Sequence, residues 1–135
     1  MKNILKKTLL TMLFLTIISC QEKSVSDELN GTWELRHIEG IQVAQVDPTF
    51  KAGNGNLLKF EGQNYERYYE GKKNENGTFT VTPEDTAINN RRANYSFTFN
   101  DNKEKIYFSL IKNKLIVFNG IIAADGTEST YEKKR

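Results

Sequence analysis

Residues 95–118 carry the pattern that decides the fold, and they read YSFTFNDNKEKIYFSLIKNKLIVF. Bulky apolar side chains occupy alternate positions in this stretch, at Tyr95, Phe97, Phe99, Ile106, Phe108 and Leu110. Alternation with a period of two indicates β-strands with one face in the core, because successive side chains of a strand point to opposite faces. Polar residues at 101–103 and at Asn113 separate the apolar runs. The stretch therefore predicts three strands, at 95–100, 105–111 and 114–118.

The same alternation extends in both directions along the chain, without an internal repeat and without a convincing helical period. It predicts five further strands, at 32–38, 56–61, 64–70, 78–82 and 127–133. Two polar segments, 72–77 and 84–94, are predicted to be loops, and Pro83 is predicted to end a strand. Eight short strands favour an all-β fold, an eight-stranded antiparallel up-and-down barrel, because closure leaves no open sheet edge.

The first twenty residues differ from the rest of the chain. Three lysines precede an apolar run at residues 8–18, and the segment ends in Ile17-Ile18-Ser19-Cys20, which contains the only cysteine. This order is typical of an export signal. As a helix the apolar run would rise only about 16 Å, whereas a bilayer core of about 30 Å needs roughly 20 residues, so a spanning helix is not expected. The remaining alternative is an ordinary secretory signal that leaves Cys20 as a free thiol.

The residues that end at Cys20 resemble the lipobox of bacterial lipoproteins. The resemblance implies cleavage before Cys20 and acylation of its thiol and new amino terminus by chains such as palmitate. Two or more acyl chains hold a protein firmly on a membrane. The chain then divides into a signal peptide at 1–19, a flexible tether at 20–29 and a barrel domain at 30–135. The expected location is the bacterial cell envelope, with a lipid anchor in the outer membrane.

Charge and cysteine content narrow the classes of partner. Without the signal the chain has the length of one domain, which is enough to bury a core, and no disulfide is available within it. Of the 19 lysines and arginines, three lie in the signal, so 16 basic residues face 17 acidic residues in the mature chain, a net charge of −1. The basic runs at 91–92 and 133–135 are short. A nucleic-acid partner is therefore not expected.

The tripeptide Gly31-Thr32-Trp33 opens the first predicted strand directly after the polar tether. Together with the lipobox, the aromatic strands and the terminal Tyr131-Glu132-Lys133, it resembles the lipocalin-like, calycin-type lipoproteins of bacterial envelopes. The resemblance implies that Gly31 lets the chain enter the barrel base tightly and that Trp33 plugs that base. It also implies a late basic residue over the indole as a cation–π partner. The candidates for that role are Lys133, Lys134 and Arg135.

The resemblance further implies a long first loop over the barrel mouth. Residues 40–55 form such a segment, with an apolar side at Ile41, Val43, Val46 and Phe50 and a turn at Gly53-Asn54-Gly55. Loops of this length in compact domains are often functional. The segment is expected to be either a movable lid or a loop packed permanently on the barrel.

An eight-stranded barrel encloses room for side chains alone or for one small ligand. Alternation places Tyr65, Arg67 and Tyr69 on one face of their strand. If that face points inward, the guanidinium would hold an anionic head group. If it points outward, Glu66, Tyr68 and Glu70 face in, because a one-residue shift exchanges the two sets. The candidate ligand-binding residues are Tyr65, Arg67, Tyr69, Phe97, Phe99 and Phe108.

Catalytic and metal-binding patterns are absent from the sequence. His37 is the only histidine, and alternation places it on the face of Trp33 and Leu35 as an interior or rim residue. It has no second imidazole and no free cysteine with which to build a zinc site, and no motif nominates a nucleophile beside it. The segment 53–55 is too short for a phosphate loop. The chain is therefore not expected to be an enzyme or to need a cofactor or metal.

Two functions follow from these observations. The leading hypothesis is a lipid-anchored envelope protein that binds a small apolar or amphipathic ligand in a lipocalin-like barrel. The alternative is a filled barrel that binds or inhibits another envelope protein through loops at 40–55, 71–77 and 83–94. The expected partners are accordingly a membrane through the lipid anchor and a small hydrophobic ligand or an envelope protein. The volume of the interior separates the two hypotheses.

Overall fold

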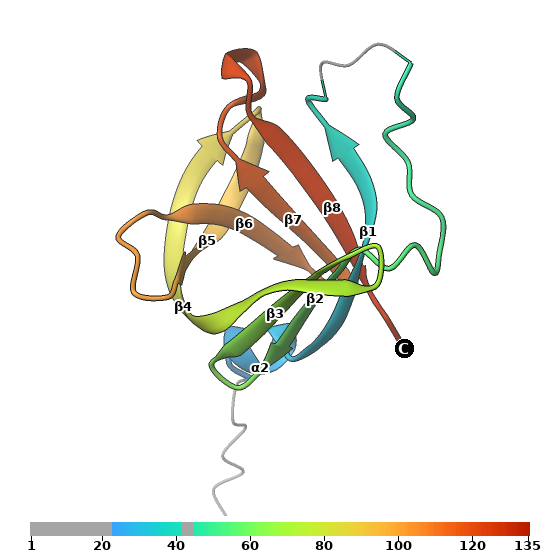
Figure 1. The fold of residues 1–135 in the computed structure, drawn as a ribbon. Helices are drawn as coiled ribbons and strands as arrows, with labels where there is room; N and C mark the ends of the chain where they lie inside the picture. The colour runs from blue at the N-terminus through green and yellow to red at the C-terminus, as the bar shows by residue number, and fades with distance from the viewer. Residues whose placement is uncertain (1–22, 42–44) are drawn as a thin grey trace, which may run out of the picture.

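The computed structural model of the protein describes residues 23–41 and 45–135. The predicted signal, Cys20 and Val43 of the first loop lie outside the described residues. The described chain forms a closed barrel of eight antiparallel strands, in which each strand pairs with the next and β8 pairs with β1 (Figure 1). The predicted fold class, an all-β antiparallel barrel, is confirmed. No helix among the described residues is both long and apolar enough to cross a membrane.

The elements follow one another around the barrel in chain order. A short helix, α2 (Val25–Leu29), precedes the strands, and a single 3₁₀ turn, η1 (Ile122–Ala124), lies between the last two. The strands are β1 (Gly31–Glu39), β2 (Leu57–Glu61), β3 (Asn64–Tyr69), β4 (Lys72–Ile88), β5 (Arg91–Phe99), β6 (Ile106–Ile111), β7 (Lys114–Asn119) and β8 (Thr127–Lys133).

The longest strand is the one that the sequence pattern described least well. The loops predicted at 72–77 and 84–94 are wrong, because β4 runs without interruption from Lys72 to Ile88 and β5 already begins at Arg91. Only Phe79 among the 17 residues of β4 is buried, so the strand lacks the apolar alternation that would reveal it. Pro83 does not end β4. It pairs with Tyr95 beside a bulge, in the part of β4 that has β5 as its strand partner, and proline is tolerated at such edges.

A bulge in β1 changes the face of His37. Leu35 lies opposite Tyr131, whereas His37 lies opposite Thr130, so one extra residue, Arg36, is inserted in β1. An inserted residue shifts the alternation of side chains along the strand. The prediction that His37 shares the face of Trp33 and Leu35 is therefore wrong. His37 instead forms an isolated bridge with Thr49 of the first loop, and its side chain is 37% exposed.

Aromatic rings fill the barrel between its two ends. Phe97 stacks on Phe108 with ring centroids 3.9 Å apart, and Phe60 stacks on the same Phe97 at 5.5 Å. All three rings are buried, and so are Leu115 and Trp33 in the same cluster. Stacked and edge-on aromatic pairs add to the energy of area burial, so this cluster contributes to the stability of the barrel.

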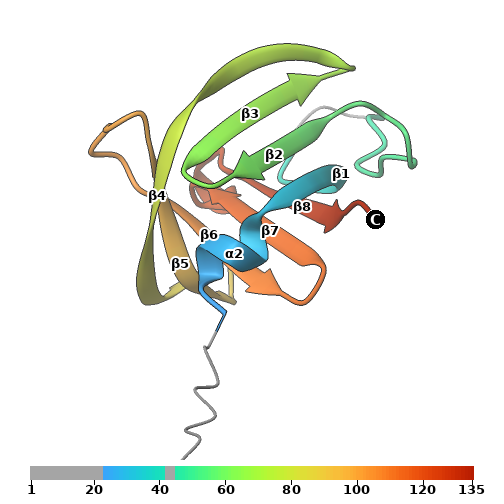
Figure 2. The same ribbon diagram turned by 90° about the horizontal axis from the view of Figure 1, so that it is seen from below.

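The helix α2 closes one end of the barrel (Figures 1 and 2). Ser24 caps the helix by accepting a hydrogen bond from the Asp27 N–H, and Leu29 is fully buried. Residues 25–29, which were predicted to belong to the tether, are therefore helical and packed. The Trp33 indole N–H donates to the Leu29 carbonyl at 2.7 Å, and Trp33 itself is fully buried.

Lys133 completes the closed end. Its Nζ lies 5.2 Å from the centroid of the Trp33 ring and donates a hydrogen bond to the Glu28 carbonyl at 2.7 Å. Gly31 has a φ of +125°, and a Cβ at this position would lie 3.0 Å from the Lys133 Cε. Glycine is therefore required here by both the backbone conformation and the lysine stem.

Candidate functional site

Arg67 lies on the inner face of the barrel. In the β2–β3 ladder Tyr65 pairs with Phe60 and Arg67 pairs with Leu58. Phe60 and Leu58 belong to the buried core, and directly opposed residues of paired strands point to the same face. Tyr65 is buried, whereas the Arg67 side chain is 40% exposed, so β3 carries its arginine up to the open end of the barrel.

A cavity of about 120 Å³ lies inside the barrel next to Arg67. Most of its wall is apolar, and Arg67, Asn119 and Tyr131 supply polar groups. Six of the eight strands contribute to this wall, through Leu58, Arg67, Phe97, Phe99, Ile106, Val117, Asn119 and Tyr131. Ligand pockets usually combine apolar walls with a few convergent polar groups. This arrangement makes the cavity the candidate binding site.

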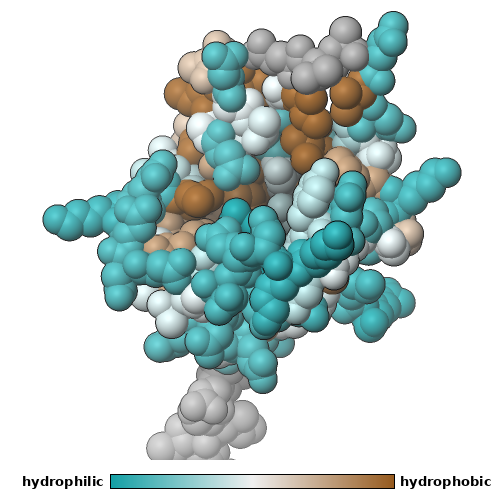
Figure 3. Space-filling view, viewed as in Figure 1, coloured by the Kyte–Doolittle hydropathy of each residue, from teal (hydrophilic) through white to brown (hydrophobic). Residues whose placement is uncertain are grey.

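A second hollow, of about 350 Å³, lies beside the first and shares Arg67 and Tyr131 with it. It occupies the open end between β1, the first loop and β3, and its wall includes Leu35, Ile38, Phe50, Asn56, Leu57, Tyr68, Tyr69 and Asn74. Large apolar side chains are exposed at this end, among them Val46, Tyr69 and Ile121. Figure 3 shows hydrophobic surface gathered in the upper half of the molecule and a largely hydrophilic lower half.

Arg67 has one acidic partner, Glu75 of β4. The guanidinium Nη1 lies 3.0 Å from Glu75 Oε2, and the Tyr65 hydroxyl donates to the other carboxylate oxygen at 2.5 Å. Asn100 donates in turn to the Tyr65 hydroxyl at 3.0 Å. Burial, followed by the contact with Glu75, raises the pKa of Tyr65, so this phenol stays protonated and remains a donor. Within the described chain the other N–H groups of Arg67 have no ion-pair partner.

The six predicted ligand-binding residues are thus distributed over three environments. Arg67, Phe97 and Phe99 line the interior cavity. Tyr65 is part of the core and contributes only its hydroxyl, through Glu75, to the polar end of the site. Tyr69 is 62% exposed and lines the outer hollow, and Phe108 is fully buried under Phe97.

Sequence reasoning missed several residues of the site. Val117 and Tyr131 lie on predicted strands, but alternation alone does not say which strands face one cavity. Glu75 was missed because its segment was predicted to be a loop. In the structure it lies directly opposite Arg67 in the β3–β4 ladder, and a register prediction for that ladder would have identified it.

The first loop forms a wall of the outer hollow along its described part. The Ile38 N–H donates to the Pro48 carbonyl at 2.9 Å, and the Phe50 N–H donates to the Arg36 carbonyl at 2.8 Å. These bonds extend the β1 ladder beyond the end of β2, and Phe50 faces the hollow. Residues 48–50 are therefore packed on β1 in this structure, and whether the loop moves stays a prediction.

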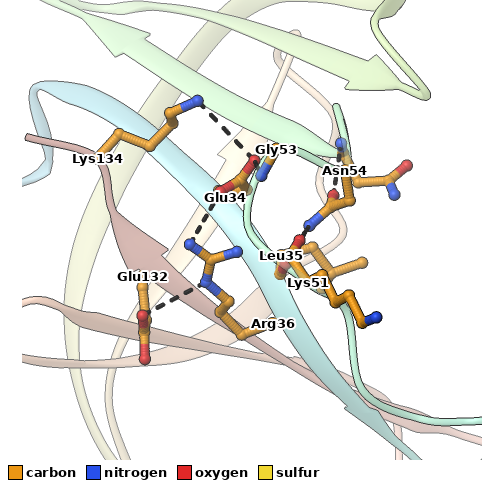
Figure 4. A network of polar contacts seen from close by, with 9 residues as sticks. Glu34, Leu35, Arg36, Lys51, Gly53, Asn54, Glu132 and Lys134 are labelled. Atoms are coloured by element: carbon orange, nitrogen blue, oxygen red, sulfur yellow. Dashed lines mark hydrogen bonds and ion pairs between the residues drawn. The ribbon is translucent and has the colours of Figure 1, made fainter.

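A buried carboxylate, Glu34, ties the same loop to the outer wall of the barrel (Figure 4). Its side chain is 1% exposed and accepts from the Gly53 N–H at 2.8 Å. Arg36 Nη2 lies 2.9 Å from the carboxylate and Lys134 Nζ lies 3.9 Å from it. The Asn54 side chain donates to the Leu35 carbonyl at 2.9 Å. This network positions the loop and so shapes the hollow.

The remaining titratable side chains include the single histidine of the chain. His37 Nε2 lies 3.8 Å from Glu39 Oε1 at the partly exposed end of β1. In the part of the chain that the structure describes, no group of three or more His, Cys, Asp or Glu side chains could hold a metal ion. The site at the open end combines one cation, Arg67, with an apolar cavity.

Comparison with protein-family models, with curated proteins and with solved structures finds no match to this chain. The architecture itself, a closed eight-stranded antiparallel barrel, is compatible with a lipocalin-like fold. The functional interpretation therefore depends on the geometry of the site.

Proposed function

We propose that this protein is a lipid-anchored, lipocalin-like envelope protein that binds a small amphipathic anion at the open end of its barrel. The observation that carries the proposal is Arg67, an inward guanidinium beside an apolar cavity, with N–H groups left over after its ion pair with Glu75. The guanidinium is 40% exposed, so its remaining N–H groups are open to water, which an anionic head group could replace. The apolar walls would hold the rest of the molecule.

The proposed anchor is Cys20, acylated after cleavage of the signal, in the envelope of a bacterium and in its outer membrane. The described chain starts beside the closed end of the barrel, where α2 packs over Trp33. An anchor joined there through the short segment 21–24 would place the open end on the side of the domain away from the membrane. The ligand would then be exchanged with the surrounding compartment, and the role would be one of binding without catalysis.

The alternative proposal, a filled barrel that contacts another envelope protein through loops, has less support. Two of its three loops, at 71–77 and 83–94, are largely parts of β4 and β5. The interior is also not completely filled, since the cavity beside Arg67 remains.

The test is a titration of the full lipidated chain in nanodiscs with two carboxylates, decanoate and 3-phenylpropionate, followed by NMR of the Leu58 and Ile106 methyl groups. We expect at least one ligand to shift these methyl signals, and Arg67→Met to weaken its binding. Arg92→Met is the matched control, because Arg92 forms a similar ion pair, with Asp85 at 2.9 Å, on the exposed β4–β5 hairpin. Failure of both ligands to bind the wild-type protein would overturn the proposal.

A further inference from the structure

The interior cavity has a volume that selects one kind of apolar group. At about 120 Å³ it is slightly smaller than the apolar protein cavities of about 150 Å³ that are known to take up benzene. The walls consist of the aromatic side chains Phe97 and Phe99 and the aliphatic side chains Leu58, Ile106 and Val117. One six-membered ring is therefore near the limit of what the cavity holds.

The floor of the cavity prevents a longer chain from passing toward the closed end. Phe108 lies against Phe97 at 3.9 Å and is fully buried, and Leu115 and Trp33 are also fully buried in the same cluster. Close-packed cores resist insertion of extra methylene groups because side chains are then forced out of their rotamers. A ten-carbon tail could not enter this floor and would have to stay in the outer hollow.

The polar side of the cavity selects the charge of the head group. Arg67 carries the only cationic side chain in the cavity wall, and Glu75 already occupies its Nη1. Glu75 and Glu104 also line the adjoining hollow on the other side of Arg67. A dianionic phosphate would be repelled by these carboxylates, whereas a single carboxylate could use the free N–H groups of the guanidinium. Burial raises the pKa of Tyr131, so its hydroxyl remains a neutral donor in the same wall.

We infer that the site takes a compact aromatic monocarboxylate, with its single ring in the interior cavity and its carboxylate on Arg67. This inference rests on the proposed function and narrows its ligand class from amphipathic anions in general to one-ring acids. A one-ring acid differs from a long-chain fatty acid in a measurable way, because its ring and its carboxylate would be recognised by different residues. Val117 and Ile106 contact the ring, and Arg67 contacts the carboxylate.

The experiment uses the full chain in nanodiscs, with the Leu58 methyl signals as the readout and with three probes: 3-phenylpropionate, decanoate and toluene. We expect wild-type protein to bind 3-phenylpropionate at least tenfold more tightly than decanoate. Arg67→Met should weaken 3-phenylpropionate about 10- to 100-fold, the range expected for a hydrogen-bonded charge, and leave toluene binding unchanged. Val117→Phe should fill the cavity and remove binding of both ring compounds. Arg92→Met should leave the binding of 3-phenylpropionate and of toluene unchanged.

The outcomes separate this inference from the proposed function. Decanoate binding as tight as that of 3-phenylpropionate, with dependence on Arg67, would overturn the one-ring ligand and leave the proposed function standing. If the wild-type protein binds neither acid, the one-ring inference and the proposed function are both overturned. If Val117→Phe does not fold, Ile106→Phe replaces it, because Ile106 is only half-buried and lines the same cavity. Unchanged toluene binding in the folded cavity-filling variant would place the ring elsewhere and would also overturn the inference.

Discussion

The closed and open ends of the barrel differ in the contacts that their polar side chains make. At the closed end the Trp33 indole donates to the Leu29 carbonyl, and the Lys133 ammonium both covers the ring and binds the Glu28 carbonyl. At the open end Arg67 has one partner and unused donors beside a cavity. The Arg67 side chain is 40% exposed beside the cavity, so an anionic ligand could replace water at its guanidinium. We propose that the closed end stabilises the fold and that the open end binds a ligand.

Two buried carboxylates on the outer wall repeat this contrast. Glu34, toward the closed end, is 1% exposed and contacts the Gly53 N–H, Arg36 and Lys134. Glu128, toward the open end, is 2% exposed and binds the Arg91 Nε at 2.8 Å through Oε1. Among the described residues its other oxygen, Oε2, is buried without a hydrogen-bond partner, and Glu39 lies opposite Glu128 in the β1–β8 ladder. The ionised form of Glu128 is therefore less well accommodated.

The tip of the β4–β5 hairpin brings Arg91 to Glu128. Asn89, in the turn of this hairpin, accepts a hydrogen bond from the Ile122 N–H at 3.0 Å. Ala93 packs with Ile116 and Phe118 of β7 in a small cluster separate from the main core. The hairpin tip thus covers the outside of β7 and reaches the start of β8, which is why Glu128 is buried.

The largest expected effect concerns Cys20, which precedes the closed end of the barrel in the sequence. Cys20→Ala should abolish acylation, because no other cysteine can carry the thioether, and should leave an uncleaved precursor or a form that does not partition into detergent. Intact-mass measurement of the membrane and soluble fractions checks this. A cleaved Cys20→Ala protein that stays on the membrane as the wild type does would contradict the anchor.

The next effect tests the packing of the closed end. Trp33→Ala should lower the free energy of unfolding by about 3–5 kcal/mol, as truncations of large buried aromatic side chains do. Urea unfolding of the full chain, followed by circular dichroism, measures the loss. Tyr69→Ala is the control, because Tyr69 is 62% exposed at the open end and its removal should cost little. Equal losses in the two variants would remove the contrast between the ends.

A pair of arginine substitutions compares the ion pair of a buried carboxylate, Glu34, with the half-exposed ion pair of Arg67 and Glu75. Arg36→Met should lower the free energy of unfolding by about 1.5–3 kcal/mol, because buried Glu34 loses its closest cation. Arg67→Met should change it by less than about 1 kcal/mol, because the pair with Glu75 is 40% exposed on both sides. The same urea experiment measures both. A larger loss for Arg67→Met would mean that this arginine supports the fold and not a ligand.

The smallest effect is a pH dependence at the outer wall. Burial raises the pKa of Glu128, with Glu39 adding to the rise and Arg91 and His37 opposing it. A carboxyl whose pKa is higher in the folded than in the unfolded state binds its proton more tightly when folded. The stability that it contributes is therefore fully present below the unfolded pKa and is lost as the pH rises through the folded pKa.

Replacement of this group tests the sign of the effect. Glu128→Gln should reduce the loss of stability between mildly acidic and neutral pH, because the neutral amide still accepts from Arg91 and carries no unsolvated charge. Urea unfolding at several pH values measures the difference. Glu34→Gln is the matched control and should destabilise the protein at neutral pH, since Arg36 and Lys134 lose their anion. A steeper pH dependence in Glu128→Gln than in wild type would show that the ion pair with Arg91 dominates.

The period-two pattern predicted much of the barrel but little of the detail at its site. It identified eight strands and placed Tyr65 and Arg67 on one face, which the structure shows to be the inner one. It failed for β4, where a strand with only Phe79 buried shows no alternation, and for His37, which follows the bulge at Arg36. Alternation reports burial on one side of a strand, so a strand exposed on both sides gives no signal.

The sequence by itself determined the class of fold and that Tyr65 and Arg67 share one face of their strand, because side-chain direction along a strand is a local property of the backbone. The structure decided that this face points inward. Only the tertiary structure decided that Glu75 holds Arg67, that the cavity measures about 120 Å³ and that Glu128 is buried with one oxygen unpaired. These features depend on register and on the approach of strands that are distant in the chain, namely the pairing of β3 with the unpredicted part of β4 and the reach of the β4–β5 tip to β8. The cavity volume and the ion-pair partners depend on how several strands pack together, so the sequence pattern of one strand does not predict them.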